Sequence, residues 1–125
     1  MKAVLDAGAL IAIDRLDRKV GAMLRVLQRD GVPVETSAAA VAQVWREGRL
    51  QANLARVLPG VDVAALGDGA ARRVGELLRA NASSDLVDAH VALLASPDAR
   101  VLTSDDDDIK ALLRTRRVRA RIVHV

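Results

Sequence analysis

Aspartates stand at three places where a predicted strand ends or a predicted helix begins. Asp6 and Asp105 each follow a short apolar run, and Asp88 lies in the first turn of a predicted helix. Parallel strands have their carboxyl ends on one side of a sheet, so the three carboxylates are expected to converge in a polar crevice. Carboxylates brought within a few ångströms repel one another, and such a cluster persists only by taking up protons or binding cations.

Divalent cations that prefer hard oxygen ligands are the expected partners of such a crevice. The chain has no cysteine, which excludes thiolate zinc sites and cysteine nucleophiles. Its two histidines, His90 and His124, are too few and too scattered to argue for catalysis. Carboxylate oxygens without thiolate or imidazole partners favour Mg²⁺ or Mn²⁺ over zinc.

Each acid taken singly has a simpler structural interpretation. An aspartate after a strand is about as often a helix cap as a ligand, which applies to Asp6. Asp85 is best explained as an acid in the first helical turn that complements the helix dipole. The acids at positions 106 to 108 are best explained as a solvated turn with a helix cap. Only the combination of the three positions favours a functional site.

Short strand patterns alternate with helical patterns along the whole chain. Strands are predicted at residues 1–5, 33–36, 61–64, 101–102 and 118–122. Helices are predicted at residues 9–16, 20–27, 37–45, 50–58, 70–78, 84–95 and 109–113. This alternation indicates an α/β fold of three α/β/α layers around a central parallel sheet of four to five strands.

Several details of these elements bear on the site. Ser37 is predicted to cap the helix that runs through Trp45, and Ser84 to cap the helix that carries the second acid. Gly48 is expected to bend or break the first of these helices. Beyond it Leu50 begins an apolar stripe, and three basic residues are predicted at helical spacing on the other side: Arg46, Arg49 and Arg56.

Length and composition bound the class of protein. A chain of 125 residues predicts a single domain, residues 1–125, with a core of its own. Hydrophobic residues make up 51% but aromatics only 1%, so the core is expected to consist of Ala, Val, Leu and Ile. No apolar run approaches the roughly 20 residues that span a membrane, and no export signal is recognisable, so a cytoplasmic protein is expected.

The charge balance leaves two explanations open. The formal net charge is +3, and arginine greatly outnumbers lysine. Arginine suits bidentate phosphate contacts, which would fit a nucleic acid partner. Codon bias in a GC-rich genome explains the same excess equally well, because net charge bears on partners and not on fold.

Three short motifs together resemble those of the PIN-domain nucleases, specifically the VapC-type toxins of bacterial toxin–antitoxin pairs. The motifs are Val4-Leu5-Asp6-Ala7-Gly8, Asp85-Leu86-Val87-Asp88-Ala89-His90 and Val101-Leu102-Thr103-Ser104-Asp105. The resemblance runs the full length of the chain, since the order of elements and the chain size also fit. It implies a PIN-like fold and a Mg²⁺- or Mn²⁺-dependent endoribonuclease that cleaves RNA, forms a homodimer and is inhibited by a small VapB-type antitoxin.

The resemblance also assigns roles to residues. Asp6, Asp88 and Asp105 match three of the four acids that form the catalytic metal pocket in that family. The fourth, a glutamate early in the third helix, is replaced by Gln43, and the nearest acid expected on the same helix face is Glu47. With three carboxylates, one tightly held ion is a better expectation than two. The hydroxyl residue usual shortly after the first aspartate is also missing.

Other side chains near the motifs are candidate substitute ligands or supports, namely Gln43, Glu47, Asp85, Thr103, Ser104 and Asp108. Gln43 still offers an amide oxygen to a cation or its water shell, and the two hydroxyl residues can position water or a phosphate. The stripe of Arg46, Arg49 and Arg56 is a candidate RNA-binding surface, although a plain solvated face explains it equally well.

Two other classes of protein compete with the nuclease as interpretations of the sequence. A phosphoacceptor receiver domain needs an adjacent acidic pair after its first strand and a lysine after its fifth, whereas this chain has the lone Asp6 and arginines. A stronger rival is a PIN-fold protein with weakened catalysis, which would bind RNA or an antitoxin through the same crevice. The amide at Gln43 is the feature that supports this alternative.

Overall fold

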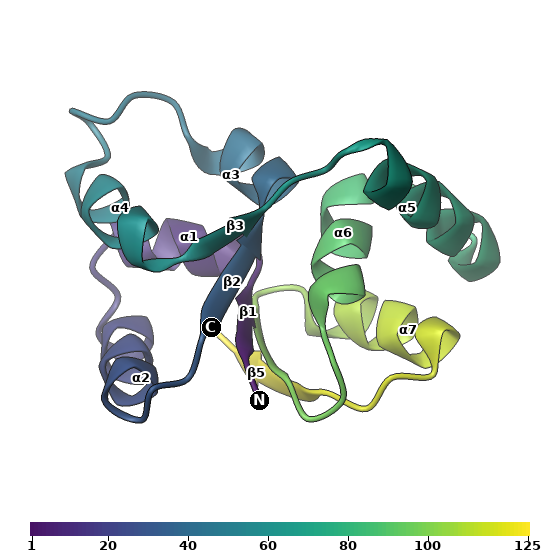
Figure 1. Ribbon diagram of the computed structural model, residues 1–125. Helices are drawn as coiled ribbons and strands as arrows, with labels where there is room; N and C mark the ends of the chain where they lie inside the picture. Colours follow the sequence, from purple (N-terminus) through teal and green to yellow (C-terminus); the bar gives the residue numbers. More distant parts are fainter.

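The computed structural model describes all 125 residues, and its strands and helices alternate along the chain (Figure 1). The strands are β1 (Ala3–Leu5), β2 (Val34–Ser37), β3 (Asp62–Ala64), β4 (Arg100–Thr103) and β5 (Arg121–His124). The helices are α1 (Ala7–Asp14), α2 (Arg18–Arg29), α3 (Ala38–Val44), α4 (Ala52–Val57), α5 (Asp68–Asn81), α6 (Leu86–Leu94) and α7 (Asp106–Arg116), with a 3₁₀ turn at Leu58–Gly60. None of the helices combines the length and the apolar character needed to cross a membrane.

The five strands form one sheet in the order β3-β2-β1-β4-β5, and every neighbouring pair is parallel. β1 lies in the centre, where Leu5 pairs with Thr36 of β2 and with Leu102 of β4. The carboxyl ends of β1 and β4 therefore lie side by side at the same end of the sheet. The predicted α/β class and parallel sheet of four to five strands are confirmed.

Helices cover both faces of this sheet. Figure 1 shows α1, α2 and α4 on one side of the strands and α5, α6 and α7 on the other. The core between these layers is a cluster of 23 buried residues, all of them Ala, Val, Leu or Ile, as predicted from the composition. Trp45 is only partly buried at the margin of this core.

α1 begins at the end of the central strand and packs into the core. Asp6 caps it, because its Oδ1 accepts a hydrogen bond of 2.8 Å from the backbone N–H of Ala9. The helix ends at Asp14, two residues before the predicted end. The chain there turns through a left-handed residue, Leu16, whose side chain is 68% exposed, so the prediction that the buried helix continues to Leu16 is wrong.

The third helix ends at Val44, one residue before the predicted end, and the side chain of Gln51 bonds the backbone that follows it. α3 stops at Val44, and the carbonyl of Val44 accepts a hydrogen bond from the amide of Gln51. The other end of that amide, Oε1, accepts from the backbone N–H groups of Arg46 and Glu47, at 2.6 and 3.1 Å. Residues 45 to 51 are thus held as a loop, and the predicted apolar stripe does not include Leu50, which is 80% exposed.

The two acid-bearing helices on the other side also begin differently from the prediction. The N-cap of α6 is Asp85, whose Oδ1 accepts from the backbone N–H of Asp88 at 3.0 Å, and not Ser84. The acids at positions 106 to 108 form the first turn of α7 and not a separate turn. This placement is favourable because carboxylates at a helix N-terminus interact with the positive end of the helix dipole.

A buried pair of polar side chains joins α3 to α6. Ser37 caps α3 as predicted, and its Oγ accepts from the backbone N–H groups of Ala39 and Ala40. Its own proton is then left to donate to Nδ1 of His90, at 2.5 Å. Burial lowers the pKa of His90, which favours the neutral ring that can accept this bond. The pair fixes the helix that carries Asp88 against the end of β2.

Ser37→Ala is expected to lower the free energy of unfolding by about 2 kcal/mol, because it removes a helix cap and leaves the buried Nδ1 of His90 without a donor. Chemical denaturation would measure the loss. The matched control is Ser84→Ala, which alters an exposed serine without a side-chain hydrogen bond and should change stability by less than about 0.5 kcal/mol. Equal stabilities of the two variants would contradict the role given to the Ser37–His90 pair.

Candidate functional site

The first carboxylate of the site, that of Asp6, is almost completely immobilised. Asp6 is 1% exposed at the end of β1. While Oδ1 caps α1, Oδ2 accepts from the hydroxyl of Thr103 and from the backbone N–H of Ser104, the latter at 3.2 Å. Thr103 is the last residue of β4, the neighbouring strand, and Ser104 comes directly after it. The sheet register therefore determines which way this carboxylate points.

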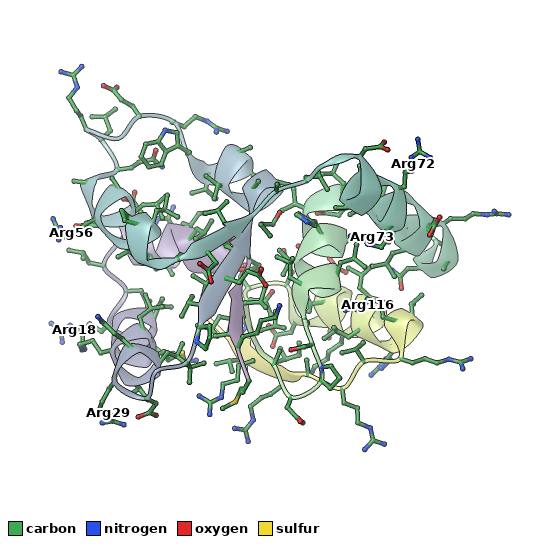
Figure 2. All side chains as sticks on the ribbon, in the orientation of Figure 1. Arg18, Arg29, Arg56, Arg72, Arg73 and Arg116 are labelled. Carbon is green, nitrogen blue, oxygen red and sulfur yellow. The ribbon has the colours of Figure 1, made fainter.

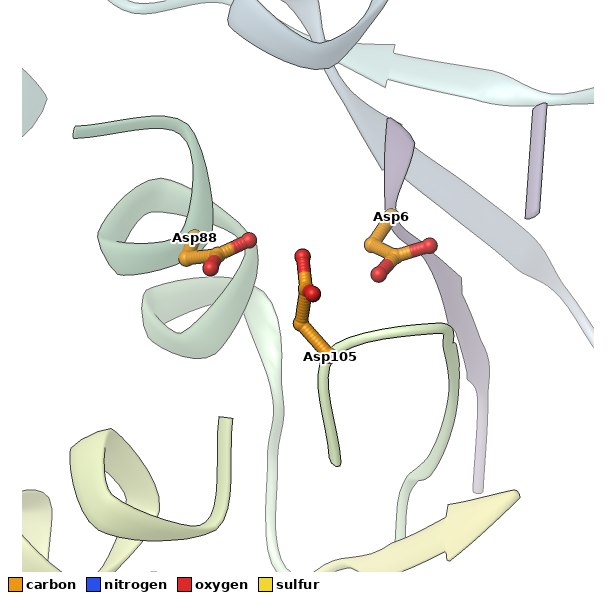
Figure 3. A group of neighbouring side chains, drawn as sticks. All are labelled: Asp6, Asp88 and Asp105. Atoms are coloured by element: carbon orange, nitrogen blue, oxygen red, sulfur yellow. The ribbon is translucent and has the colours of Figure 1, made fainter. Parts of the chain in front are cut away.

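The second and third carboxylates come from α6 and from the residue after β4. Asp88 is 5% exposed on the first turn of α6, and Asp105 is exposed as the N-cap residue of α7. One carboxylate oxygen from each of Asp6, Asp88 and Asp105 lies within 4.8 Å of the others. Figure 3 shows the three side chains pointing toward one another from three different elements. The structure therefore confirms that these three side chains converge, as the sequence predicted.

Burial and mutual repulsion make this cluster a poor place for negative charge. Burial, and then the charges of Asp85, Asp105, Asp6 and Asp108, raise the pKa of Asp88 from its ordinary 3.8 to about 7. Burial also raises the pKa of Asp6, although the hydrogen bonds from Thr103, Ala9 and Ser104 oppose the rise. Near neutral pH the cluster therefore binds a proton or a cation more readily than an ordinary set of surface acids.

One oxygen of the cluster lacks any partner within the protein. Oδ2 of Asp88 is the single buried side-chain oxygen or nitrogen without a hydrogen bond. A buried polar atom without a partner is unfavourable by about 1–3 kcal/mol, so such an atom needs a ligand or a proton. Three carboxylates with hard oxygen donors, one of them unpartnered, are a donor set that fits Mg²⁺ or Mn²⁺.

The structure places the predicted supporting residues unequally. Thr103 and Ser104 both contact Asp6, and Thr103 Oγ1 also accepts from the backbone N–H of Asp105 at 2.8 Å. Asp85 contributes as the cap of α6 and through its charge on Asp88. Asp108 lies on the exposed first turn of α7, where its charge also raises the pKa of Asp88.

The two side chains considered as replacements for the missing glutamate differ. Gln43 is an exposed residue in the last turn of α3. Glu47 does not continue that helix, because α3 ends at Val44, and its Oε1 accepts a hydrogen bond of 3.1 Å from Nε of Arg49. The prediction that Glu47 lies one helical turn beyond Gln43 on the same face is therefore wrong.

The predicted stripe of arginines on one helix is also wrong. Arg46 and Arg49 lie in the loop of residues 45 to 51, and only Arg56 is in α4. Arg46 Nη1 donates to two backbone carbonyls, those of Ala42 and Trp45. Figure 2 shows Arg56 with Arg18 and Arg29 on one side of the molecule, and Arg72, Arg73 and Arg116 on the other. Arg46 and Arg49 therefore do not share a helix with Arg56, because the loop interrupts the helical spacing that the sequence suggested.

Two contacts of the elements that carry the site had no clear signal in the sequence. His124, at the end of β5, bonds Asp106 of α7 through Nδ1 at 2.8 Å. Arg116 donates through Nη1 to the carbonyls of Ala92 and Ala95, and so satisfies the C-terminal end of α6. Each contact joins residues at least 18 positions apart, which local sequence patterns do not register.

No protein-family model matches this chain, and no curated protein matches its sequence. Among solved structures, the chain is similar to VapBC2 from Rickettsia felis, bound to a DNA fragment from its promoter. The match has a TM-score of 0.70 at 15% identity, and it covers 100% of this chain and 99% of that chain. The PIN-like α/β/α fold is thereby confirmed over the whole length of the chain.

In metal-free buffer, we expect the free energy of unfolding to fall as the pH rises from about 4 to about 7. The pKa of Asp88 is raised from its ordinary 3.8 to about 7 in the folded protein. At pH values between these two, the folded protein holds a proton on Asp88 that the unfolded chain has lost. Raising the pH removes that proton and the stability linked to it. Denaturation across this range should give a shallower decline for Asp88→Asn, and identical slopes would contradict the raised pKa.

Proposed function

We propose that this protein is a metal-dependent endoribonuclease, the VapC-type toxin of a toxin–antitoxin pair, acting in the cytoplasm. The observation that carries the proposal is the convergence of three carboxylates, with the buried Oδ2 of Asp88 unpartnered, at the carboxyl ends of parallel strands. The fold shared with VapBC2 supports the same assignment.

Asp6, Asp88 and Asp105 would hold Mg²⁺ or Mn²⁺ in this proposal. Such a cation would lower the pKa of a bound water molecule and neutralise negative charge that develops on the phosphate. Asp6 would act as the fixed ligand, because Thr103, Ser104 and Ala9 already orient both of its oxygens. Asp88 would exchange its proton for the cation near neutral pH, since its pKa lies at about 7.

The proposed partner is a small VapB-type antitoxin. The similar structure is a VapBC complex, and an acidic cluster attracts a basic side chain. We place the antitoxin across the acids and over the loop that carries Trp45 and the exposed Leu50, where a partner would bury apolar surface. The toxin itself would form a homodimer. Co-purification with the product of the adjacent reading frame, and its loss in a Leu50→Asp variant, would test this surface.

A PIN-fold binding module with weakened catalysis is the second candidate. It is favoured by Gln43, because an amide oxygen attracts a divalent ion far less than a carboxylate does. In that case the cluster would still bind a cation and RNA or the antitoxin, and a manganese titration would not lead to cleavage.

Asp88→Asn and Asp105→Asn are each expected to lower Mn²⁺-dependent cleavage of single-stranded RNA by about 100-fold or more, because each removes a charged ligand. Both variants should stay folded, and relief of repulsion should raise their melting temperature in metal-free buffer. The matched control is Asp107→Asn, an exposed acid on the first turn of α7 that is not part of the cluster. Undiminished cleavage in both cluster variants would refute the site.

Asp6→Asn should also abolish cleavage, but it is a less clean variant. Both oxygens of the Asp6 carboxylate accept hydrogen bonds, from three donor groups in all. An asparagine would replace one of these oxygens with an NH₂ group, which would then face a donor. A lower melting temperature is therefore expected together with the loss of activity. Circular dichroism of this variant separates unfolding from loss of the ligand.

Gln43→Glu tests the weakened module against the active nuclease. If position 43 faces the cluster, the added carboxylate should tighten Mn²⁺ binding about tenfold and raise cleavage at low metal concentration. Calorimetric titration of Mn²⁺ would measure the affinity. The matched control is Gln28→Glu, which makes the same change on the exposed surface of α2 and should leave affinity unaltered. Unchanged affinity in Gln43→Glu would show that α3 directs this side chain elsewhere.

A further inference from the structure

Gly8 stands in the first turn of α1, two residues after Asp6, in ordinary helical conformation. A glycine in a helix is less favourable than alanine by about 1 kcal/mol, so its backbone does not explain why it is there. The space around it does. A Cβ atom on residue 8 would lie 2.0 Å from Oγ and 2.8 Å from Cβ of Ser104, both of which are impossible contacts.

The hydroxyl of Ser104 therefore occupies the volume that a side chain on residue 8 would need. The same volume borders the acid cluster, because Oδ1 of Asp6 lies 3.3 Å from that Cβ position. The backbone of Ser104 is fixed there as well, since its N–H donates to Oδ2 of Asp6 at 3.2 Å. Ser104 lies between Thr103, which orients Asp6, and Asp105, the third acid of the cluster.

This hydroxyl is unused within the protein. Ser104 is exposed, and its Oγ makes no hydrogen bond to another residue, whereas the hydroxyl of Thr103 makes two. The backbone N–H groups of Ala7 and Gly8, at the start of α1, also have no acceptor in the protein. A free hydroxyl and two free N–H groups thus adjoin the carboxylate of Asp6. Donors in this arrangement suit an anionic oxygen.

We infer that Ser104 is a substrate-binding residue that donates its hydroxyl to a phosphate oxygen of RNA held at the acid cluster, and that Gly8 is present to leave room for it. The inference rests on the proposed function and adds a named contact to it. The cluster would supply the cation-binding oxygens, and Ser104 with the start of α1 would supply donors to the phosphate on the Asp6 side.

Ser104→Ala should lower kcat/KM for single-stranded RNA about tenfold, the effect of one hydrogen bond to a charged group. Mn²⁺ affinity should be unchanged, because the variant removes a phosphate contact and not a metal ligand. Binding of a labelled RNA oligonucleotide in Ca²⁺, followed by fluorescence anisotropy, should weaken by a similar factor. Calorimetry with Mn²⁺ alone supplies the readout that does not depend on cleavage.

Gly8→Ala should reproduce the defect of Ser104→Ala, because the new Cβ displaces the hydroxyl. The double variant Gly8→Ala/Ser104→Gly also removes the Cβ of residue 104, which would lie 2.8 Å from the new Cβ, and should be no worse than either Gly8→Ala or Ser104→Ala, since all of them remove the same contact. Gly8→Ser/Ser104→Gly returns a hydroxyl to the shared volume from the opposite side and should recover part of kcat/KM. Gly75→Ala is the matched control, because a Cβ on this glycine of α5 meets nothing within 4 Å.

The possible results are distinguishable. If the wild type cleaves RNA and Ser104→Ala has the same kcat/KM, the inference is overturned and the proposed function stands. Weaker Mn²⁺ binding in Ser104→Ala would also overturn it, since the residue would then act on the metal. Additive losses in the double variant would separate Gly8 from Ser104. Absence of both cleavage and RNA binding in wild type would remove the proposed function and this inference together.

Discussion

Repulsion among three carboxylates is the constraint on which the site depends. Asp6, Asp88 and Asp105 would move apart if they were free, and the fold prevents it by fixing each from a different element. The central strand carries the first, and α6 is fixed through the Ser37–His90 pair. Because burial and this repulsion both disfavour negative charge in the folded protein, the cluster readily binds a proton or a cation.

The sequence was most informative where position along an element decides the outcome. Strand ends in a parallel sheet converge, and this alone predicted that Asp6 and Asp105 approach each other. The aliphatic composition predicted which residue types form the core, and the alternation of strand and helix patterns predicted the class of fold. These properties depend on backbone geometry and on burial, which are common to all parallel α/β proteins.

Local patterns were misleading where a side-chain contact, and not the spacing of residue types, decides the structure. The spacing of Arg46, Arg49 and Arg56 is helical, but the amide of Gln51 satisfies the backbone of the intervening residues and ends α3 at Val44. Ser84 and Asp85 are both good helix caps, and only the fold selects Asp85. The fit of the Ser104 hydroxyl over Gly8 joins residues nearly a hundred positions apart, so no window along the sequence contains it.

The triple hydrogen bonding of Asp6 gives the site an uneven tolerance to change during evolution. Asp88 and Asp105 make no such set of bonds, so a descendant that lost either acid would keep its fold and could persist as a binding protein. A descendant that lost Asp6 would lose the cap of α1 and the link to β4 at the same time. We therefore expect inactive relatives of this chain to retain the aspartate at position 6 long after the acids at positions 88 and 105 have changed.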